Sequence, residues 1–236
     1  SDYHNLSNNS QTLKNIANNI WDSDGSTCIC CGILKANSCF DNKVFYDNFN
    51  DQINGANPLG WAISQSGSIV DITTSSLEGN RATVIARTGS NNPSFTHIFN
   101  PQEDKLNVEF LVRHDTGTNG RFRLEIGGLN DWNTYYDYII LKMYGGQIRN
   151  NDNSITPYLL NTSYKIRVEI IPGTNTYKLY VNEILINSNL PTYSTIGNVA
   201  RLSFKTENSQ INYKIDAINI SLSEKLCDTQ INRTRE

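Results

Sequence analysis

Apolar residues recur at every second position in short runs from Lys43 onward. The run KLNVEFLVR (105–113) is the clearest, and Leu111 is its one exception. Its apolar face would hold Leu106, Val108, Phe110 and Val112. Successive side chains of a strand point to opposite faces, so this period predicts strands that bury one face and expose the other.

Several other segments alternate in the same way. They are 44–49, 81–87, 94–99, 120–128, 137–144, 164–171, 176–182, 183–187, 200–206 and 212–222. In the last segment the period slips between Ala217 and Ile218, which predicts a β-bulge. Turns such as TGTNG, YGGQ, PGTNT and SNLP separate the segments. About a dozen short strands with one apolar face predict an all-β fold, a two-sheet antiparallel jelly-roll sandwich over 43–223.

The first 42 residues lack this pattern and form a predicted polar arm. Their one periodic segment, SQTLKNIANNIWDSD (10–24), predicts a short helix with an apolar stripe and with Ser10 as its N-cap. We therefore divide the chain into a Cys-rich arm (1–42), the sandwich (43–223) and a C-terminal tail (224–236).

The arm holds four of the five cysteines: Cys28, Cys30, Cys31 and Cys39, with Cys227 near the C-terminus. Their spacing does not match the paired knuckles of a zinc site. Because five is odd, an oxidising compartment leaves at least one cysteine free or bonded to another chain. One interpretation is local disulfides that staple the arm, one of them to Cys227. The other is an arm that bonds covalently to a neighbouring subunit.

Composition narrows the function further. The net charge of −3 does not suggest nucleic-acid binding, which requires a basic surface. No apolar run is long enough to cross a membrane. The 33 asparagines, with many Thr, Ser, Tyr and Gly, indicate a polar, uncharged surface. That composition is typical of exported β proteins, and we expect an extracellular, cell-surface or spore-surface location.

The order of motifs resembles a known superfamily. YDNFND (46–51) and Gly60-Trp61 precede FLVRHDTGTNGRFRLEIGG (110–128), YKIRVEIIPGTNTYKLYVNEILI (164–186) and NYKIDAINI (212–220). Residues 43–223 thereby resemble the concanavalin A-like lectin/glucanase superfamily, especially its laminin-G-like and carbohydrate-binding branches. That resemblance implies lectins, carbohydrate-binding modules, hydrolases, lyases or structural domains, so function has to be argued from a site.

Catalytic motifs of the superfamily are missing. Glycoside hydrolysis needs two neighbouring carboxylates, and the superfamily's E-x-D-x-x-E run is absent. We interpret Glu109, Glu125 and Glu169 as solvated strand residues. A lyase would use Tyr and His as acid and base, beside Arg. Candidates for such a set are His97, His114, Arg121, Arg123, Tyr136, Tyr138, Tyr144 and Arg149.

The segment DWNTYYDY (131–138) is the best candidate for a sugar site. Aromatic platforms beside amides and carboxylates bind sugars, and here they would be Asp131, Trp132, Tyr135 and Tyr136. The alternative is that these rings cap the core. Structural calcium is a further candidate through Asp131, Asp137 and Asp152, although loop aspartates are also common turn formers.

Two functional hypotheses follow. The first, which we favour from the sequence, is a non-catalytic structural subunit that self-assembles into an extracellular or spore-surface fibre through its disulfide-forming arm. The cysteine pattern of the arm resembles subunits of endospore appendage fibres. The second is a carbohydrate-binding, lectin-like module whose partner is a polysaccharide. A polysaccharide lyase or glycoside hydrolase is the third.

Overall fold

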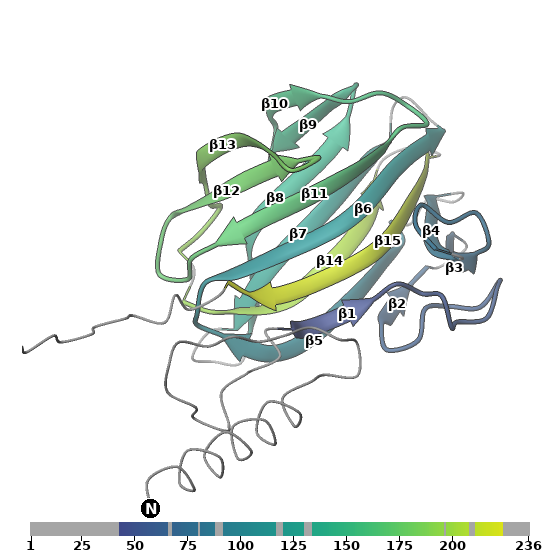
Figure 1. Cartoon of the computed structure of the whole chain (residues 1–236), viewed down its shortest axis with the longest axis horizontal. Helices are drawn as coiled ribbons and strands as arrows, with labels where there is room; N and C mark the ends of the chain where they lie inside the picture. Colours follow the sequence, from purple (N-terminus) through teal and green to yellow (C-terminus); the bar gives the residue numbers. More distant parts are fainter. Residues whose placement is uncertain are drawn as a thin grey trace, which may run out of the picture. The chain divides into compact units, whose positions relative to one another are not determined.

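The computed structural model describes residues 43–65, 68–79, 81–87, 92–116, 120–129, 134–195, 197–207 and 211–223. Regular structure in these residues is entirely β, arranged as two antiparallel sheets packed face to face (Figure 1). This confirms the predicted all-β sandwich. Within the same residues, no helix has the length and hydrophobicity to span a membrane.

Sheet A has the order β13-β12-β11-β6-β15-β4-β3, and β1 also pairs with β15. Its strands are β1 (Lys43–Asp47), β3 (Ile69–Thr73), β4 (Ala82–Arg87), β6 (Leu106–Thr116), β11 (Ser163–Ile170), β12 (Thr176–Val181), β13 (Ile184–Pro191) and β15 (Ile211–Leu222). Sheet B has the order β10-β9-β8-β7-β14-β5-β2. Its strands are β2 (Ala62–Ser64), β5 (Ser94–Gln102), β7 (Arg121–Leu129), β8 (Tyr135–Tyr144), β9 (Gln147–Asn150), β10 (Asn153–Pro157) and β14 (Val199–Glu207).

The core lies between the two sheets and is built from the predicted apolar faces. Phe204 of sheet B has its ring centroid 5.2 Å from that of Phe110 in sheet A and 5.0 Å from that of Phe95. Leu111, the exception in the pattern, points to the outer face of sheet A, where it pairs with Lys165 on one side and Asp216 on the other. The apolar period therefore identified which strand faces are buried.

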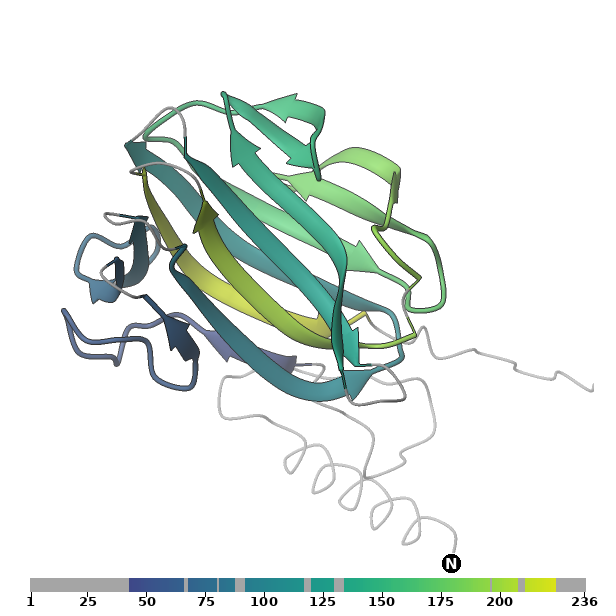
Figure 2. The same cartoon turned by 180° about the vertical axis from the view of Figure 1, so that it is seen from behind.

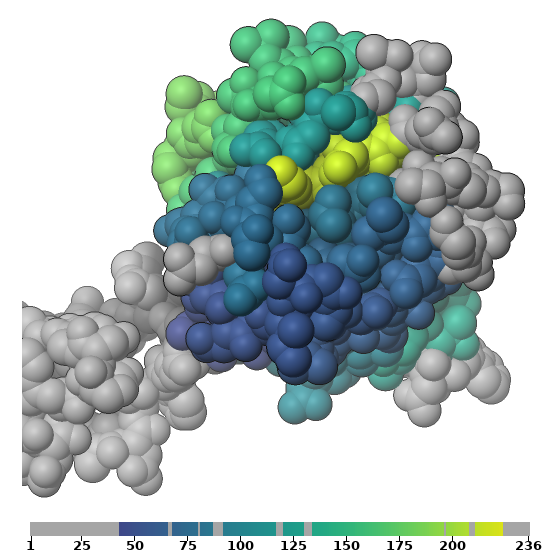
Figure 3. All heavy atoms as spheres, turned by 90° about the vertical axis from the view of Figure 1, so that its right-hand side faces the viewer, coloured from purple at the N-terminus to yellow at the C-terminus, as the bar shows by residue number. Residues whose placement is uncertain are grey.

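The predicted bulge in β15 is present. The register of β15 shifts between Asp216 and Asn219, and Ala217 has a φ of 48°. On one edge, β15 pairs with β4 before the bulge and with β1 after it. The buried Asp216 carboxylate accepts backbone N–H bonds from Leu77, Glu78 and Ala217. The bulge thus ties the chain after β3 to the centre of sheet A. In Figure 3 the segment from β1 to β4, in purple to blue, lies together on the side of the sandwich that faces the viewer.

The β8–β9 turn confirms the predicted YGGQ turn. Gly145 and Gly146 have φ values of 59° and 70°, a conformation that favours glycine in a two-residue hairpin loop. In contrast, β2, β3, β9 and β10 lie outside the predicted segments. They have three, five, four and five residues, and a period of two is harder to recognise over such short runs.

The outermost strands of both sheets are short or irregular. Sheet B ends in β10, which has a register shift and closes at Pro157, and in the three-residue β2. Sheet A ends in β13, which has two register shifts and closes at Pro191, and in β3. The arm with its predicted helix and the tail lie outside the described residues, so the division into three parts stays a prediction.

Candidate functional site

The outer face of sheet B carries a band of charged side chains. Figure 2 views this face, and no other described strand lies in front of β7, β8 and β14. Outward positions alternate with core residues along these strands and on β9. They hold Arg121, Arg123, Glu125, Asp137, Lys142, Arg149, Arg201, Ser203, Lys205 and Glu207. Because the register places Arg123 beside Lys205 and Glu125 beside Ser203, these side chains form continuous rows across the sheet.

Glu125 lies at the centre of this band and is only 1% exposed. Its two carboxylate oxygens are 2.6 Å from Arg123 Nη2 and 2.6 Å from Lys205 Nζ. A buried carboxylate is stable only beside such opposite charges. The interpretation of Glu125 as a solvated strand residue is therefore wrong. The side chains of Arg123 and Lys205 are longer than that of Glu125 and cover it.

Asp137 and Glu207 hold the guanidinium groups in place. Asp137 pairs through Oδ1 with Arg201 Nη2, and its Oδ2 lies 3.5 Å from Arg123 Nη2. Glu207 Oε1 is 3.1 Å from Arg123 Nη1. Arg123 thus contacts three carboxylates on three strands, which gives it a defined position on the face.

Tyr135 is the aromatic residue that joins this network. The Arg201 guanidinium carbon lies 5.7 Å from its ring centroid, and Tyr135 shares a face with Asp137, two residues on. Tyr136, 49% exposed, points to the opposite side by strand alternation. Tyr138, a candidate of the acid–base set, is buried in the core. Asp131 and Trp132 lie outside the described residues, so their part in the site stays a prediction.

The carboxylates proposed for calcium are engaged by cations. Asp137 pairs with Arg201 and Arg123, while Asp152 lies 3.0 Å from Lys142 Nζ and accepts a hydrogen bond from the Tyr144 hydroxyl. The Lys142 hydrogen bond is the main reason that the pKa of Asp152 is lowered. Among the described residues, no three His, Cys, Asp or Glu side chains are grouped so that they could hold a metal ion.

His114, a candidate acid or base, is a core residue. It is buried and stacks on Tyr213, with ring centroids 4.3 Å apart. Its Nε2 lies 3.0 Å from the Thr116 carbonyl oxygen, which can only accept, so Nε2 carries the proton. Nδ1 then accepts from the Tyr158 hydroxyl at 2.8 Å. Both ring nitrogens are satisfied inside the sandwich.

The rest of the candidate acid–base set is divided between the inside and the outside. His97 points inward at one edge, where its ring stacks on Phe45 at 3.7 Å and Nδ1 lies 3.1 Å from the Gly60 carbonyl oxygen. Arg121, Arg123, Tyr144 and Arg149 lie on the outer face of sheet B. The eight candidates therefore do not converge on one site.

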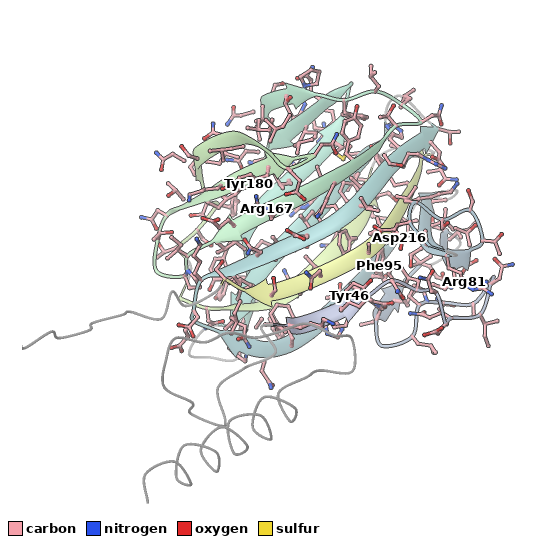
Figure 4. The ribbon with its side chains drawn as sticks, viewed as in Figure 1. Tyr46, Arg81, Phe95, Arg167, Tyr180 and Asp216 are labelled. Atoms are coloured by element: carbon pink, nitrogen blue, oxygen red, sulfur yellow. The ribbon has the colours of Figure 1, made fainter. Side chains whose placement is uncertain are left out.

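Sheet A has its own network on the opposite face. Arg167 lies 3.4 Å from Glu109, 3.7 Å from Glu183 and 3.8 Å from Glu169. Its guanidinium carbon is 3.5 Å from the Tyr180 ring centroid, and Figure 4 shows the two side chains together on this face. Glu109 and Glu169 are thus ion-paired and not simply solvated.

Sequence inspection missed Arg201, Lys205 and Glu207 as site residues. The only available signal was the alternation in ARLSFKTE (200–207), which places Arg201, Ser203 and Lys205 on one face. Their partners lie on other strands and are not adjacent in sequence. All five cysteines lie outside the described residues, so both disulfide interpretations stay predictions.

Comparisons with solved structures identify the fold. The chain is similar to a sialidase, with a TM-score of 0.62 and 13% identity over 78% of this chain and 19% of that one. It is also similar to a Bacillus subtilis protein with a galectin-like fold. That match has a TM-score of 0.52 and 10% identity and covers 76% of this chain and 96% of that one. A third match is the binding domain of botulinum neurotoxin DC in complex with SialylT. Its TM-score is 0.52 and its identity 11%, over 78% of this chain and 48% of that one.

No family model matches the chain, and no curated protein matches it in sequence. The chain covers a small part of the sialidase and about half of the neurotoxin chain, so it corresponds to one part of each. The endospore appendage resemblance gains no support from these comparisons. At these identities the likeness shows the fold alone, which is a two-sheet antiparallel β-sandwich.

Proposed function

We propose that residues 43–223 form a non-catalytic carbohydrate-binding module whose site is the outer face of sheet B. The observation that carries this proposal is the position of Tyr135 beside Arg201, Asp137 and Arg123. Sugars bind where an aromatic surface lies next to a few well-placed polar groups. The face provides both, on adjacent strands of a rigid sheet.

The ion pairs of this face favour binding because they restrict its side chains in advance. Arginine and lysine side chains normally lose rotamer freedom when they engage a ligand. Here Arg123 and Arg201 are already held by Asp137, Glu125 and Glu207. Their remaining N–H groups can donate to sugar hydroxyls with little further ordering.

The outer face of sheet A is the less suitable of the two. Arg167 lies 3.5 Å from the Tyr180 ring centroid and so covers that ring. Arg201 is 5.7 Å from the Tyr135 centroid and leaves more of that ring available. Tyr135 also follows directly on the segment that contains Trp132.

The similar structures support the proposal through what their names state. One has a galectin-like fold, and another is a neurotoxin binding domain in complex with SialylT. A polysaccharide partner belongs to this proposal, and so does an extracellular or surface location, where such polymers occur. The fibre-subunit hypothesis stays a prediction that rests on the cysteines.

The test is binding of the full chain to a glycan array, followed by affinity measurements on the best ligand. We expect Tyr135→Ala and Arg201→Gln each to weaken binding about tenfold, the effect of losing one charged hydrogen bond or ring contact. Tyr180→Ala, on the opposite face, is the matched control and should bind normally. The proposal is wrong if the chain binds no glycan, or if Tyr180→Ala weakens binding as much as Tyr135→Ala.

A further inference from the structure

Tyr144 lies between two arginines on the outer face of sheet B. The guanidinium carbon of Arg121 is 4.5 Å from its ring centroid, and that of Arg149 is 4.3 Å. Arg121 comes from β7 and Arg149 from β9, the strands on either side of β8. The negative π-face of the ring attracts both cations and so holds two like charges close together.

Neither guanidinium forms an ion pair with a carboxylate of the described residues. The other two arginines of this face, Arg123 and Arg201, are paired with carboxylates. In the described part of the chain, no carboxylate oxygen lies within 4.0 Å of Arg121 or Arg149. Arg149 donates one hydrogen bond, to the Asp152 carbonyl oxygen, while its Nε is buried without a partner. Each guanidinium has five N–H donors, so most of them remain available.

The acidic residues beside the two arginines are already engaged. Asp152 is bound to Lys142 and to the Tyr144 hydroxyl, and Glu207, which lies opposite Arg121 in the strand register, is paired with Arg123. Among the described residues of this face and of the β9–β10 turn beside it, six basic side chains stand against four acidic ones, although the chain as a whole carries −3. The basic ones are Arg121, Arg123, Lys142, Arg149, Arg201 and Lys205; the acidic ones are Glu125, Asp137, Asp152 and Glu207. The excess positive charge is therefore concentrated where Arg121 and Arg149 form no ion pair with a carboxylate of the described residues.

We propose that Arg121, Tyr144 and Arg149 form an anion-binding subsite, and that the ligand of this module is an anionic polysaccharide with carboxylate or sulfate groups on its sugars. Guanidinium groups bind such oxyanions through two parallel N–H bonds. Tyr144 positions the two arginines, and each takes one acidic group of the chain. Binding an anion also relieves the repulsion between the two cations. This inference rests on the proposed function and specifies its ligand class.

The experiment compares three polymers with the full chain: polygalacturonate, dextran sulfate and neutral dextran. We expect binding to at least one anionic polymer, weakened by salt because charge attraction is screened. The double variant Arg121→Gln/Arg149→Gln should lose about tenfold or more in affinity for it. Whichever anionic polymer binds tighter identifies carboxylate or sulfate as the recognised group.

The matched control is Arg167→Gln on sheet A. Arg167 also lies beside a tyrosine, Tyr180, but three carboxylates already engage its guanidinium group. Equal weakening by Arg167→Gln would mean general charge attraction and would overturn the subsite. Binding to a neutral glycan that the double variant retains would overturn the subsite and leave the proposed function intact. No binding to any glycan would overturn both. Urea unfolding of each variant confirms that it is folded.

Discussion

A few polar side chains are buried inside the sandwich, and each of them needs a hydrogen-bond partner there. His114 accepts from the Tyr158 hydroxyl, and the Tyr213 hydroxyl donates to the Met143 carbonyl oxygen. Burial raises the pKa of Tyr158 and of Tyr213, so both hydroxyls stay protonated at neutral pH. These groups stabilise the fold because each buried donor has an acceptor.

Tyr158→Phe tests this role. It would remove the hydroxyl that donates to the buried His114 Nδ1, and the loss of a buried hydrogen bond of this kind lowers stability by about 1–3 kcal/mol. We expect the free energy of unfolding in urea to fall by that amount while glycan binding stays unchanged. Tyr180→Phe, on the outer face, should leave both unchanged. A loss of glycan binding in Tyr158→Phe with normal stability would contradict a purely structural role.

Glu169 on sheet A makes stability depend on pH. Burial tends to raise the pKa of its carboxyl, but hydrogen bonds from Lys178 and Lys105 outweigh burial and lower the pKa below 4.5. The folded state therefore binds this proton less readily than the unfolded state. The resulting stability is fully present above about pH 4.5, the usual value for this carboxyl, and is lost as the pH falls below that value through the lowered pKa of the folded state.

We expect Glu169→Gln to flatten this pH dependence. Wild-type protein should lose stability between about pH 5 and pH 3, and the variant should lose roughly 0.5–1 kcal/mol less over that range. Urea unfolding at a series of pH values measures the difference. Glu103→Gln, at an exposed position without an ion pair among the described residues, is the control. Identical slopes for the wild type and Glu169→Gln would show that the ion pairs contribute nothing.

At the scale of elements, the end of β7 must lie unusually close to its neighbours. A Cβ atom at Gly128 would overlap the Asn198 carbonyl oxygen and the Tyr138 ring. This close approach lets β8 pair with β7 up to Tyr135 and so positions the proposed sugar platform. A side chain at Gly128 would separate the strands at that point.

Gly128→Ala should therefore be destabilising. The overlap involves backbone that cannot move away easily, and overpacking of this kind lowers stability by about 1–3 kcal/mol. We expect a lower urea midpoint together with weaker glycan binding, because Tyr135 and Asp137 would shift. Gly197→Ala is the control, since nothing lies within 4 Å of a Cβ there. A Gly128→Ala protein as stable as Gly197→Ala would disprove the close approach.

The elements were largely predictable from the sequence, but the site was only partly so. Alternation predicted the long strands and the β15 bulge because burial of one face imposes a period of two. The high density of aromatic residues in 131–138 indicated Tyr135 as a candidate site residue. The Arg201–Asp137 contact joins residues 64 positions apart, and such a pairing depends on strand order, which periodicity does not contain. For the same reason Glu125 could not be predicted to be buried.

At the scale of the whole molecule, the described core is built from residues of the sandwich alone. We therefore expect a fragment of residues 43–223 to unfold cooperatively and to bind the same glycans with the affinity of the full chain. Circular dichroism and the same binding assay measure this. A fragment that is folded but does not bind would show that the arm or the tail supplies part of the site.

The arm makes a separate prediction. If its cysteines bond to neighbouring subunits, denaturing electrophoresis of the full chain without reductant should show a ladder. Reductant should collapse that ladder to 26.6 kDa. Cys30→Ser and Cys31→Ser should remove it. A monomer in both lanes would rule out the covalent fibre and leave local disulfides or free thiols.

The irregular outer strands have a consequence for crowding. A sheet edge with a long row of unpaired N–H and C=O groups recruits strands from other molecules. Among the described residues the edges offer such a row only over short stretches. Strands β1, β2 and β3 have five residues or fewer, and β10 and β13 have register shifts and end in proline. If the module binds a polymer as proposed, copies crowded along it would find little template for strand exchange on these edges.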